Sequence, residues 1–199
     1  MGVRETSRSG RRAARLATTG AAVLSVAVLA GCAAAPAYDG VLWLQMRDQQ
    51  AAVMDLGGTA MRSVPRDGLL AALDEVAIVW DSQLPAPVLP TAEPVSVVYD
   101  VRDSGPDELG DPTIEFTEFV SSGSRPDVPR QDAGTDAGDY RGPSTVYTCY
   151  TWRVVFVADQ VWEMRVRGYA DGDDMTCDAR LIERLPQDAV HIATADLLG

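Results

Sequence analysis

The side chains in this sequence that could carry catalysis do not form a recognisable catalytic pattern. His191 is the single histidine among 199 residues, and a catalytic histidine needs a nucleophile to activate and a third group to orient it. Serine and aspartate are plentiful, but no spacing singles any of them out, and the G-x-S-x-G pattern is absent. Hydrolysis by two carboxylates could draw on Glu115, Glu118 or Glu163. The sequence therefore predicts no catalytic residue, and a carboxylate hydrolase remains an alternative.

Metal binding is not predicted either. Two acidic stretches, which begin at Asp132 and Asp171, resemble calcium loops in composition. Their twelfth positions are Pro143 and Ile182, where an EF-hand loop needs a bidentate glutamate. The few cysteines and the single histidine are also too few for a zinc site without acidic ligands. We expect no metal and no cofactor, with solvated acidic loops at both stretches, and an irregular calcium site is the alternative.

The clearest alternation of apolar and polar residues spans 145–157 and 161–169, and it predicts two antiparallel strands joined by the loop 158–160. Burial selects the register, because a shift of one residue moves every apolar side chain of a strand to the opposite face. The selected register pairs Phe156 with Trp162, Val154 with Met164 and Trp152 with Val166.

Three arginines on this hairpin are the best candidates for a binding contact. The selected register places Arg153 directly opposite Arg165, on the same face as Arg167. Like charges that face each other across strands destabilise a sheet unless a negative group neutralises them. Glu163 and the acidic loops could do this within the chain, and an anionic ligand or partner is the alternative.

Hydrophobic periodicity indicates the elements that would hold this hairpin. Apolar residues recur at three- and four-residue steps over 41–56 and 66–80, which predicts two helices. Four prolines within 83–94 indicate an extended connector. Further strands are expected at 95–101 and 113–120.

The segment 121–144 is rich in Ser, Gly, Pro and Asp, and its length without periodicity predicts a mobile loop. The predicted elements give an α+β fold in which two N-terminal helices pack on an antiparallel sheet of four or more strands. Residues 41–199 have the length of a single domain.

The first 32 residues have the pattern of an export signal. Five arginines lie within residues 1–15, and the run 16–30 that follows them is uncharged. This run is shorter than the roughly 20 residues that a membrane-spanning helix needs. The motif LAGC that ends at Cys32 resembles the lipobox of bacterial lipoproteins. This resemblance implies that residues 1–31 are cleaved off as a signal peptide, that Cys32 is acylated, and that 32–40 form a short tether. An uncleaved transmembrane anchor and a buried core helix are the alternatives.

Export would change both the cysteine count and the charge. Cys149 and Cys177 then form an even pair, which outside the cytoplasm predicts a disulfide, with two unpaired thiols as the alternative. Loss of residues 1–31 removes five arginines and one glutamate, which leaves 12 basic and 28 acidic residues and a formal charge of −16. Such a charge repels nucleic acid, so no nucleic-acid partner is expected.

The amino-acid usage points to the source. Every Lys-or-Arg position is arginine and asparagine is absent, which is typical of a GC-rich bacterial genome.

These observations favour a lipid-anchored protein on the outer face of a bacterial cell membrane. The expected partners are the membrane, through the lipid on Cys32, and an envelope protein or ligand of unknown identity. A non-enzymatic binding or interaction module is the preferred function, because no catalytic constellation is present. An envelope hydrolase and an assembly factor of a membrane complex are the alternatives.

Overall fold

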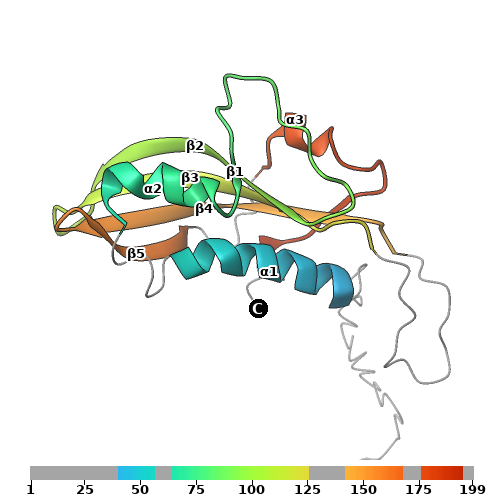
Figure 1. Ribbon diagram of the computed structural model, residues 1–199, viewed down its shortest axis with the longest axis horizontal. Helices are drawn as coiled ribbons and strands as arrows, with labels where there is room; N and C mark the ends of the chain where they lie inside the picture. The colour runs from blue at the N-terminus through green and yellow to red at the C-terminus, as the bar shows by residue number, and fades with distance from the viewer. Residues whose placement is uncertain (1–39, 57–63, 126–141, 168–175, 195–199) are drawn as a thin grey trace, which may run out of the picture. The chain divides into compact units, whose positions relative to one another are not determined.

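A mixed sheet of six strands forms the centre of the computed structural model (Figure 1). The structure describes residues 40–56, 64–125, 142–167 and 176–194. The described elements, in chain order, are α1 (Gly40–Leu56), the 3₁₀ turn η2 (Arg66–Gly68), α2 (Leu69–Asp74), β1 (Ile78–Val79), β2 (Val95–Pro106), β3 (Pro112–Ser121), β4 (Val146–Val157), β5 (Gln160–Arg167), α3 (Ala179–Ile182) and β6 (Val190–His191). The predicted signal peptide, Cys32 and the tether up to residue 39 lie outside the described residues, and none of the described helices is long and apolar enough to cross a membrane.

The strand order is β1-β2-β3-β4-β5, and β6 pairs with β4. The long strands β2 to β5 are antiparallel to their neighbours. The short strands β1 and β6 pair in parallel with β2 and β4. The chain therefore combines helices with a mixed sheet, as an α+β fold requires, and the expectation of a purely antiparallel sheet is wrong for these two short strands.

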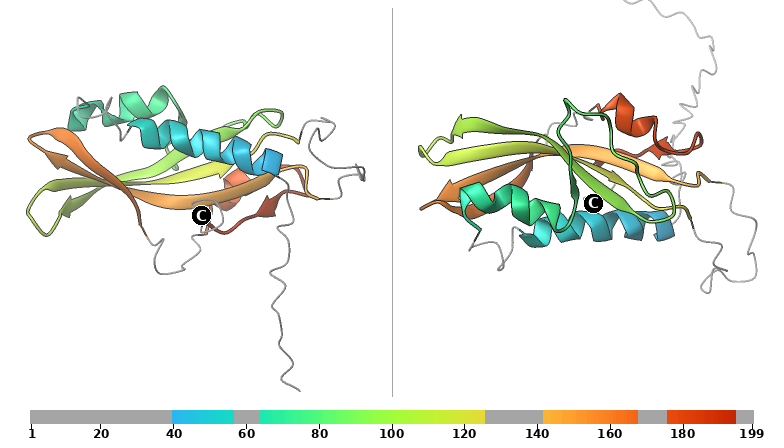
Figure 2. Two further views of the ribbon diagram at one scale, coloured as in Figure 1. Left: turned by 90° about the horizontal axis from the view of Figure 1, so that it is seen from below. Right: turned by 45° about the horizontal axis from the view of Figure 1, so that its top comes forward.

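Helix α1 is stabilised because its apolar residues recur with helical spacing and are buried against the sheet. Its buried residues are Leu42, Met46, Gln50 and Val53, which lie three or four positions apart on one face. The apolar members of this set share a core cluster with residues of β2, β3 and β4. Figure 2 shows α1 lying along one face of the sheet.

The second helix is shorter than its periodicity predicts. It ends at Asp74, and the following Ile78 and Val79 pair with Val97 and Val98 of β2 instead of continuing a helix. A short run of β-branched residues fits a buried strand as well as a helix, and periodicity alone does not separate the two. Residues 78–79 form a strand rather than a helix because they pair with the edge of β2.

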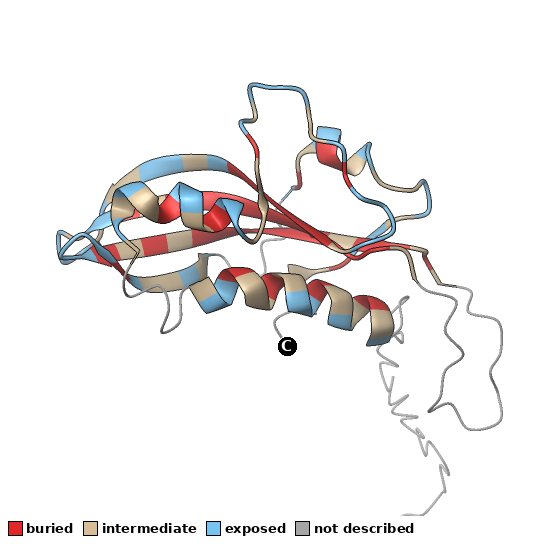
Figure 3. Cartoon of the chain, in the orientation of Figure 1, coloured by how far each residue is buried: buried red, intermediate tan, exposed pale blue. Residues whose placement is uncertain are grey.

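Each face of the sheet supports its own apolar core. On one face, which we call the helix face, buried residues of α1 and α2 share an apolar cluster with residues of β2, β3 and β4. The opposite face, which we call the outer face, carries a second cluster in which the 80–89 segment and α3 cover the sheet. Figure 1 shows α1 and α3 on opposite sides of the sheet, and Figure 3 shows the burial that results.

The β4–β5 hairpin confirms most of the predicted register. Trp152 pairs with Val166 and Val154 pairs with Met164, as burial requires. The predicted pair of Phe156 with Trp162 is wrong, because a bulge pairs Phe156 with Val161 instead and leaves Trp162 65% exposed.

The turn explains this difference. Ala158 and Asp159 both have positive φ values, 50° and 64°, so a two-residue turn replaces the predicted three-residue loop. Two residues with positive φ match the twist of antiparallel strands. The extra residue is then accommodated within β5 as the bulge.

The predicted loop 121–144 begins later than expected. Strand β3 extends to Ser121, and Ser122 is buried, with its Oγ accepting a hydrogen bond from the backbone N–H of Val146 at 2.9 Å. The backbone N–H of Ser124 donates to the carbonyl of Thr91 at 2.8 Å. Residues 126–141, where most of the predicted mobility falls, lie outside the described residues.

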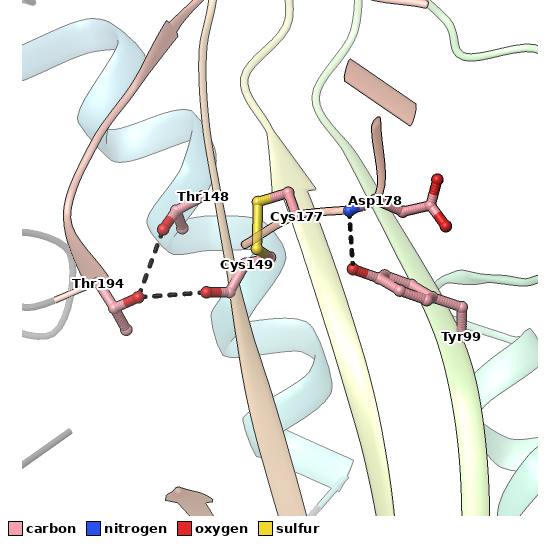
Figure 4. The surroundings of a disulfide bond; sticks show 6 residues. All are labelled: Tyr99, Thr148, Cys149, Cys177, Asp178 and Thr194. Atoms are coloured by element: carbon pink, nitrogen blue, oxygen red, sulfur yellow. Dashed lines mark hydrogen bonds between the residues drawn. A yellow bond between two sulfur atoms is a disulfide. The ribbon is translucent and has the colours of Figure 1, made fainter. Parts of the chain in front are cut away.

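The predicted disulfide is present between Cys149 and Cys177 (Figure 4). Cys149 lies in β4 and is fully buried in the cluster on the outer face. Beside the bond, the backbone N–H of Asp178 donates to the Tyr99 hydroxyl at 3.3 Å, and the Thr194 hydroxyl donates to the carbonyl of Cys149 at 3.2 Å. The bond thus fastens the segment that leads into α3 to the middle of the sheet.

Candidate functional site

The outer face carries a cluster of arginines around one buried glutamate. The side chain of Glu115, in β3, is only 5% exposed and accepts charge-assisted hydrogen bonds from two strands. Its Oε2 accepts from Nη2 of Arg102 at 3.0 Å, and its Oε1 accepts from Nη1 of Arg167 at 2.8 Å. Glu115 thereby neutralises part of the positive charge that the hairpin brings to this face.

Arg153 lies beside these ion pairs but does not take part in either of them. The sheet register places Arg153 between Glu115 of β3 and Arg165 of β5, as the sequence predicts for the two arginines. Arg165 is paired with Glu163 of its own strand. Arg153 is half-buried, and its Nε is shielded from solvent. Its side chain makes no hydrogen bond and no ion pair with any residue that the structure describes. Internal neutralisation therefore serves Arg165 and Arg167 but not Arg153. We call Arg102, Arg153, Arg165 and Arg167 with Glu115 the arginine site.

A cavity of about 340 Å³ opens next to Arg153. One wall comes from the hairpin, and the other comes from the turn between β2 and β3. The lining residues are Asp107, Glu108, Leu109, Arg153, Val155, Glu163 and Arg165. The arginine site thus borders a space large enough for a small ligand.

Sequence reasoning missed Arg102 for a structural reason. In an uninterrupted strand, Tyr99 and Arg102 would lie on opposite faces because side chains alternate. The β2–β3 register shifts between them, so that Tyr99 pairs with Thr117 and Arg102 pairs with Glu115, two residues apart on β3. Asp100 has a φ of 52° within this irregularity. An aspartate in a strand sequence gives no clear signal of such a bulge.

The carboxylates proposed for hydrolysis do not form a pair. Glu115 lies on the outer face, whereas Glu118, three residues further along β3, lies on the helix face among Val98 and Tyr150. Glu163 and Glu115 share the outer face, but each is engaged by arginine. The sheet itself separates Glu115 from Glu118, so these two cannot act on one bond.

Glu118 is instead a buried carboxyl group inside the helix-face core. Its Oε1 accepts a hydrogen bond from the Ser96 hydroxyl at 2.6 Å, and its Oε2 accepts one from Nε1 of Trp152 at 2.6 Å. Burial raises its pKa to about 7, against the opposing effect of the hydrogen bonds from Ser96 and Trp152. A group with this pKa changes its charge near neutral pH without contact with solvent.

The remaining candidates contribute no further site. His191 is exposed on β6, and its ring lies 5.4 Å from that of Tyr147. The acidic stretches that begin at Asp132 and Asp171 fall largely outside the described residues, and no three His, Cys, Asp or Glu side chains within the described part could hold a metal ion together. A second cavity, of about 480 Å³, lies between α2 and β2, with Trp80 in its wall under the guanidinium of Arg180.

No known protein family, no curated protein and no solved structure matches this chain.

Proposed function

We propose that this chain is a lipid-anchored envelope protein that binds an anionic group at the arginine site and is not an enzyme. The observation that carries the proposal is Arg153. It is a half-buried cation, opposite another arginine, with a shielded Nε that meets no partner in the described part of the chain. In this proposal the two N-terminal helices close one face of the sheet and leave part of the outer face for binding.

Of the five described residues with a buried side-chain atom that meets no partner, Arg153 is the one that carries a charge, and a charged donor of this kind requires an explanation. Leaving such a group without a hydrogen bond costs about 1–3 kcal/mol, and more when it is charged. On the strands, four arginines meet two glutamates, so this wall of the cavity is positive, whereas the facing turn carries Asp107 and Glu108. A carboxylate or phosphate at Arg153 would supply the missing acceptor and relieve the repulsion between Arg153 and Arg165.

The location is proposed on two grounds. The lipobox pattern at Cys32 implies an acyl anchor, and two or more acyl chains hold a protein stably on a membrane. The buried disulfide fits an oxidising compartment outside the cytoplasm. The proposed partners are the membrane, through the lipid, and an envelope protein or ligand that presents an anion. Nucleic acid is not proposed as a partner, because the acidic charge opposes it.

Arg153→Gln tests the binding function. We expect the purified protein to bind inorganic phosphate weakly, and the substitution to weaken that binding about tenfold, because a charge-assisted hydrogen bond contributes about 1.5–3 kcal/mol. Calorimetric or NMR titration would measure the affinity. Arg184→Gln is the matched control, since it removes the same charge from an exposed position beside α3. Equal affinities of the Arg153→Gln and wild-type proteins would refute the proposal.

Cys32→Ala tests the anchor. We expect the variant to lose acyl labelling and to remain uncleaved before residue 32, because the acylated cysteine defines the cleavage position in the family that the motif resembles. Metabolic labelling with a fatty acid, together with the mass of the N-terminal peptide, gives both readouts. Labelling that persists in the variant would exclude Cys32 as the site.

A further inference from the structure

The cavity beside the arginine site has walls of opposite charge. Arg153 and Arg165 project from the hairpin side, and Asp107 and Glu108 belong to the turn between β2 and β3. Although Arg153 and Glu108 line the same cavity, they form no ion pair with each other. The cavity itself therefore keeps a cation and an anion apart.

The other charges of the cavity already have partners within the chain. Arg165 is paired with Glu163. Oδ1 of Asp107 accepts hydrogen bonds from the backbone N–H groups of Leu109 and Asp111, both at 2.9 Å, and so holds the turn in shape. Among the residues that the structure describes, Glu108 makes no side-chain hydrogen bond and no ion pair. Arg153 and Glu108 thus remain as the two unmatched charges.

A plain anion fits this cavity poorly. Arg153 would attract it, but the carboxylates of Asp107 and Glu108 would repel it from the opposite wall. A ligand with an anionic end and a cationic end would satisfy both walls. Between the charged walls lie Val155 and Leu109, the latter 87% exposed, and both can cover a short carbon chain. The volume of about 340 Å³ lies at the lower end of the range for ligand pockets, which favours a small molecule or a headgroup.

We propose that this cavity binds a small zwitterion whose carboxylate or phosphate contacts Arg153 and whose ammonium group contacts Glu108. The inference rests on the proposed function, because it assigns a ligand class to the same arginine site. A free amino acid, a short peptide with both of its ends free and an ethanolamine phosphate all carry these two charges.

Two pairs of probes separate the zwitterion from the plain anion. Phosphoethanolamine is compared with ethyl phosphate, and β-alanine is compared with propionate, so that within each pair the ammonium group is the only charged difference. Titration of the full chain should show about two- to fivefold tighter binding of the zwitterion in one pair or both, because Glu108 is exposed. Tighter binding of phosphoethanolamine would assign the site to phosphate headgroups, and tighter binding of β-alanine would assign it to amino acids or short peptides. No preference within either pair would overturn the inference.

Substitution of Glu108 gives opposite signs for the two ligand classes. Glu108→Gln should weaken the zwitterion about two- to fivefold, the size expected for an ion pair with an exposed carboxylate, and should tighten the matched plain anion. The substitution removes an attraction in the first case and a repulsion in the second. Glu108 is exposed in a turn, so its replacement should leave the fold intact, and the exposed Glu183→Gln is the control for net charge. If Glu108→Gln tightens both ligands, the site takes simple anions, and the proposed function stands while this inference fails. If Arg153→Gln changes neither ligand, the proposed function itself fails.

Discussion

The free energy of unfolding should fall as the pH rises from about 5 to about 8, and Glu118→Gln should remove most of this fall. Glu118 is fully buried in the helix-face core, and burial raises its pKa from 4.5 to about 7. The folded chain therefore holds the proton more tightly than the unfolded chain does. The resulting stabilisation is fully present below pH 4.5 and is lost as the pH rises through 7.

The size of this effect follows from the pKa difference. Each pKa unit corresponds to 1.36 kcal/mol, so the shift of Glu118 corresponds to about 3 kcal/mol, a large share of the stability of a typical domain. Above pH 8 the glutamine variant should be the more stable protein, because it carries no charge in the core. Below pH 5 it should be equal or slightly less stable, because an amide nitrogen cannot accept the hydrogen bond that Ser96 or Trp152 donates.

Urea unfolding between pH 5 and 8.5 measures this dependence. The exposed Glu183→Gln serves as the control and should follow the wild-type curve. Other carboxyl groups act in a separate window, because hydrogen bonds lower their pKa values and their stabilisation is lost only as the pH falls below about 4. These groups are Asp103, bonded to the backbone N–H of Gly105, Asp178, bonded to the side chain of Arg180, and Asp188, bonded to the backbone N–H of Ser144. Parallel curves for wild type and Glu118→Gln would show that Glu118 is charged in the fold near pH 7.

The burial of Glu118 also marks where sequence reasoning ends. In the stretch from Ile114 to Val120, residues at even positions lie on the helix face and residues at odd positions lie on the outer face. Both faces of β3 are buried, so neither carries the polar pattern that would orient the strand. Phe116 and Phe119 are both apolar but lie on opposite faces, so they give conflicting indications of which face is buried. The face of β3 on which Glu118 lies depends on which helices cover that face. The local sequence of β3 does not contain this information.

The arginine pair was open to prediction because β4 and β5 offer the information that β3 lacks. One face of the hairpin is apolar and the other is polar, so burial alone fixes Arg153 opposite Arg165. Glu108 lacked any such signal. It lies in the turn between β2 and β3, and it shares a cavity with Arg153 only because the strand order places these strands beside the β4–β5 hairpin. The positive half of the cavity was therefore predictable, and the negative half was not.

Loss of the disulfide is the other change with a large expected effect. Cys149 and Cys177 are 28 positions apart, and closing a loop of this length stabilises the folded state by roughly 3–4 kcal/mol in the chain-entropy model. The bond also holds the segment that leads to α3, where Leu181 is fully buried in the outer-face cluster. Replacement of both cysteines by alanine should therefore lower the unfolding midpoint in urea and lower Tm by about 10 °C. Serine is unsuitable, because it would bury two hydroxyl groups in an apolar cluster.

The same variant separates stability from binding. Arg153 lies further along β4 than Cys149, beside Arg165 rather than beside α3, and it belongs to the part of the outer face that the cluster around the disulfide does not include. At a temperature where the double alanine variant is still folded, its affinity for the probes of the arginine site should equal that of the wild type, while its unfolding midpoint is lower. Reduction of the wild-type protein should reproduce the lower midpoint, since it opens the same loop. An unchanged midpoint after complete reduction would show that packing of Leu181 and its neighbours, rather than the covalent bond, holds this end of the domain together.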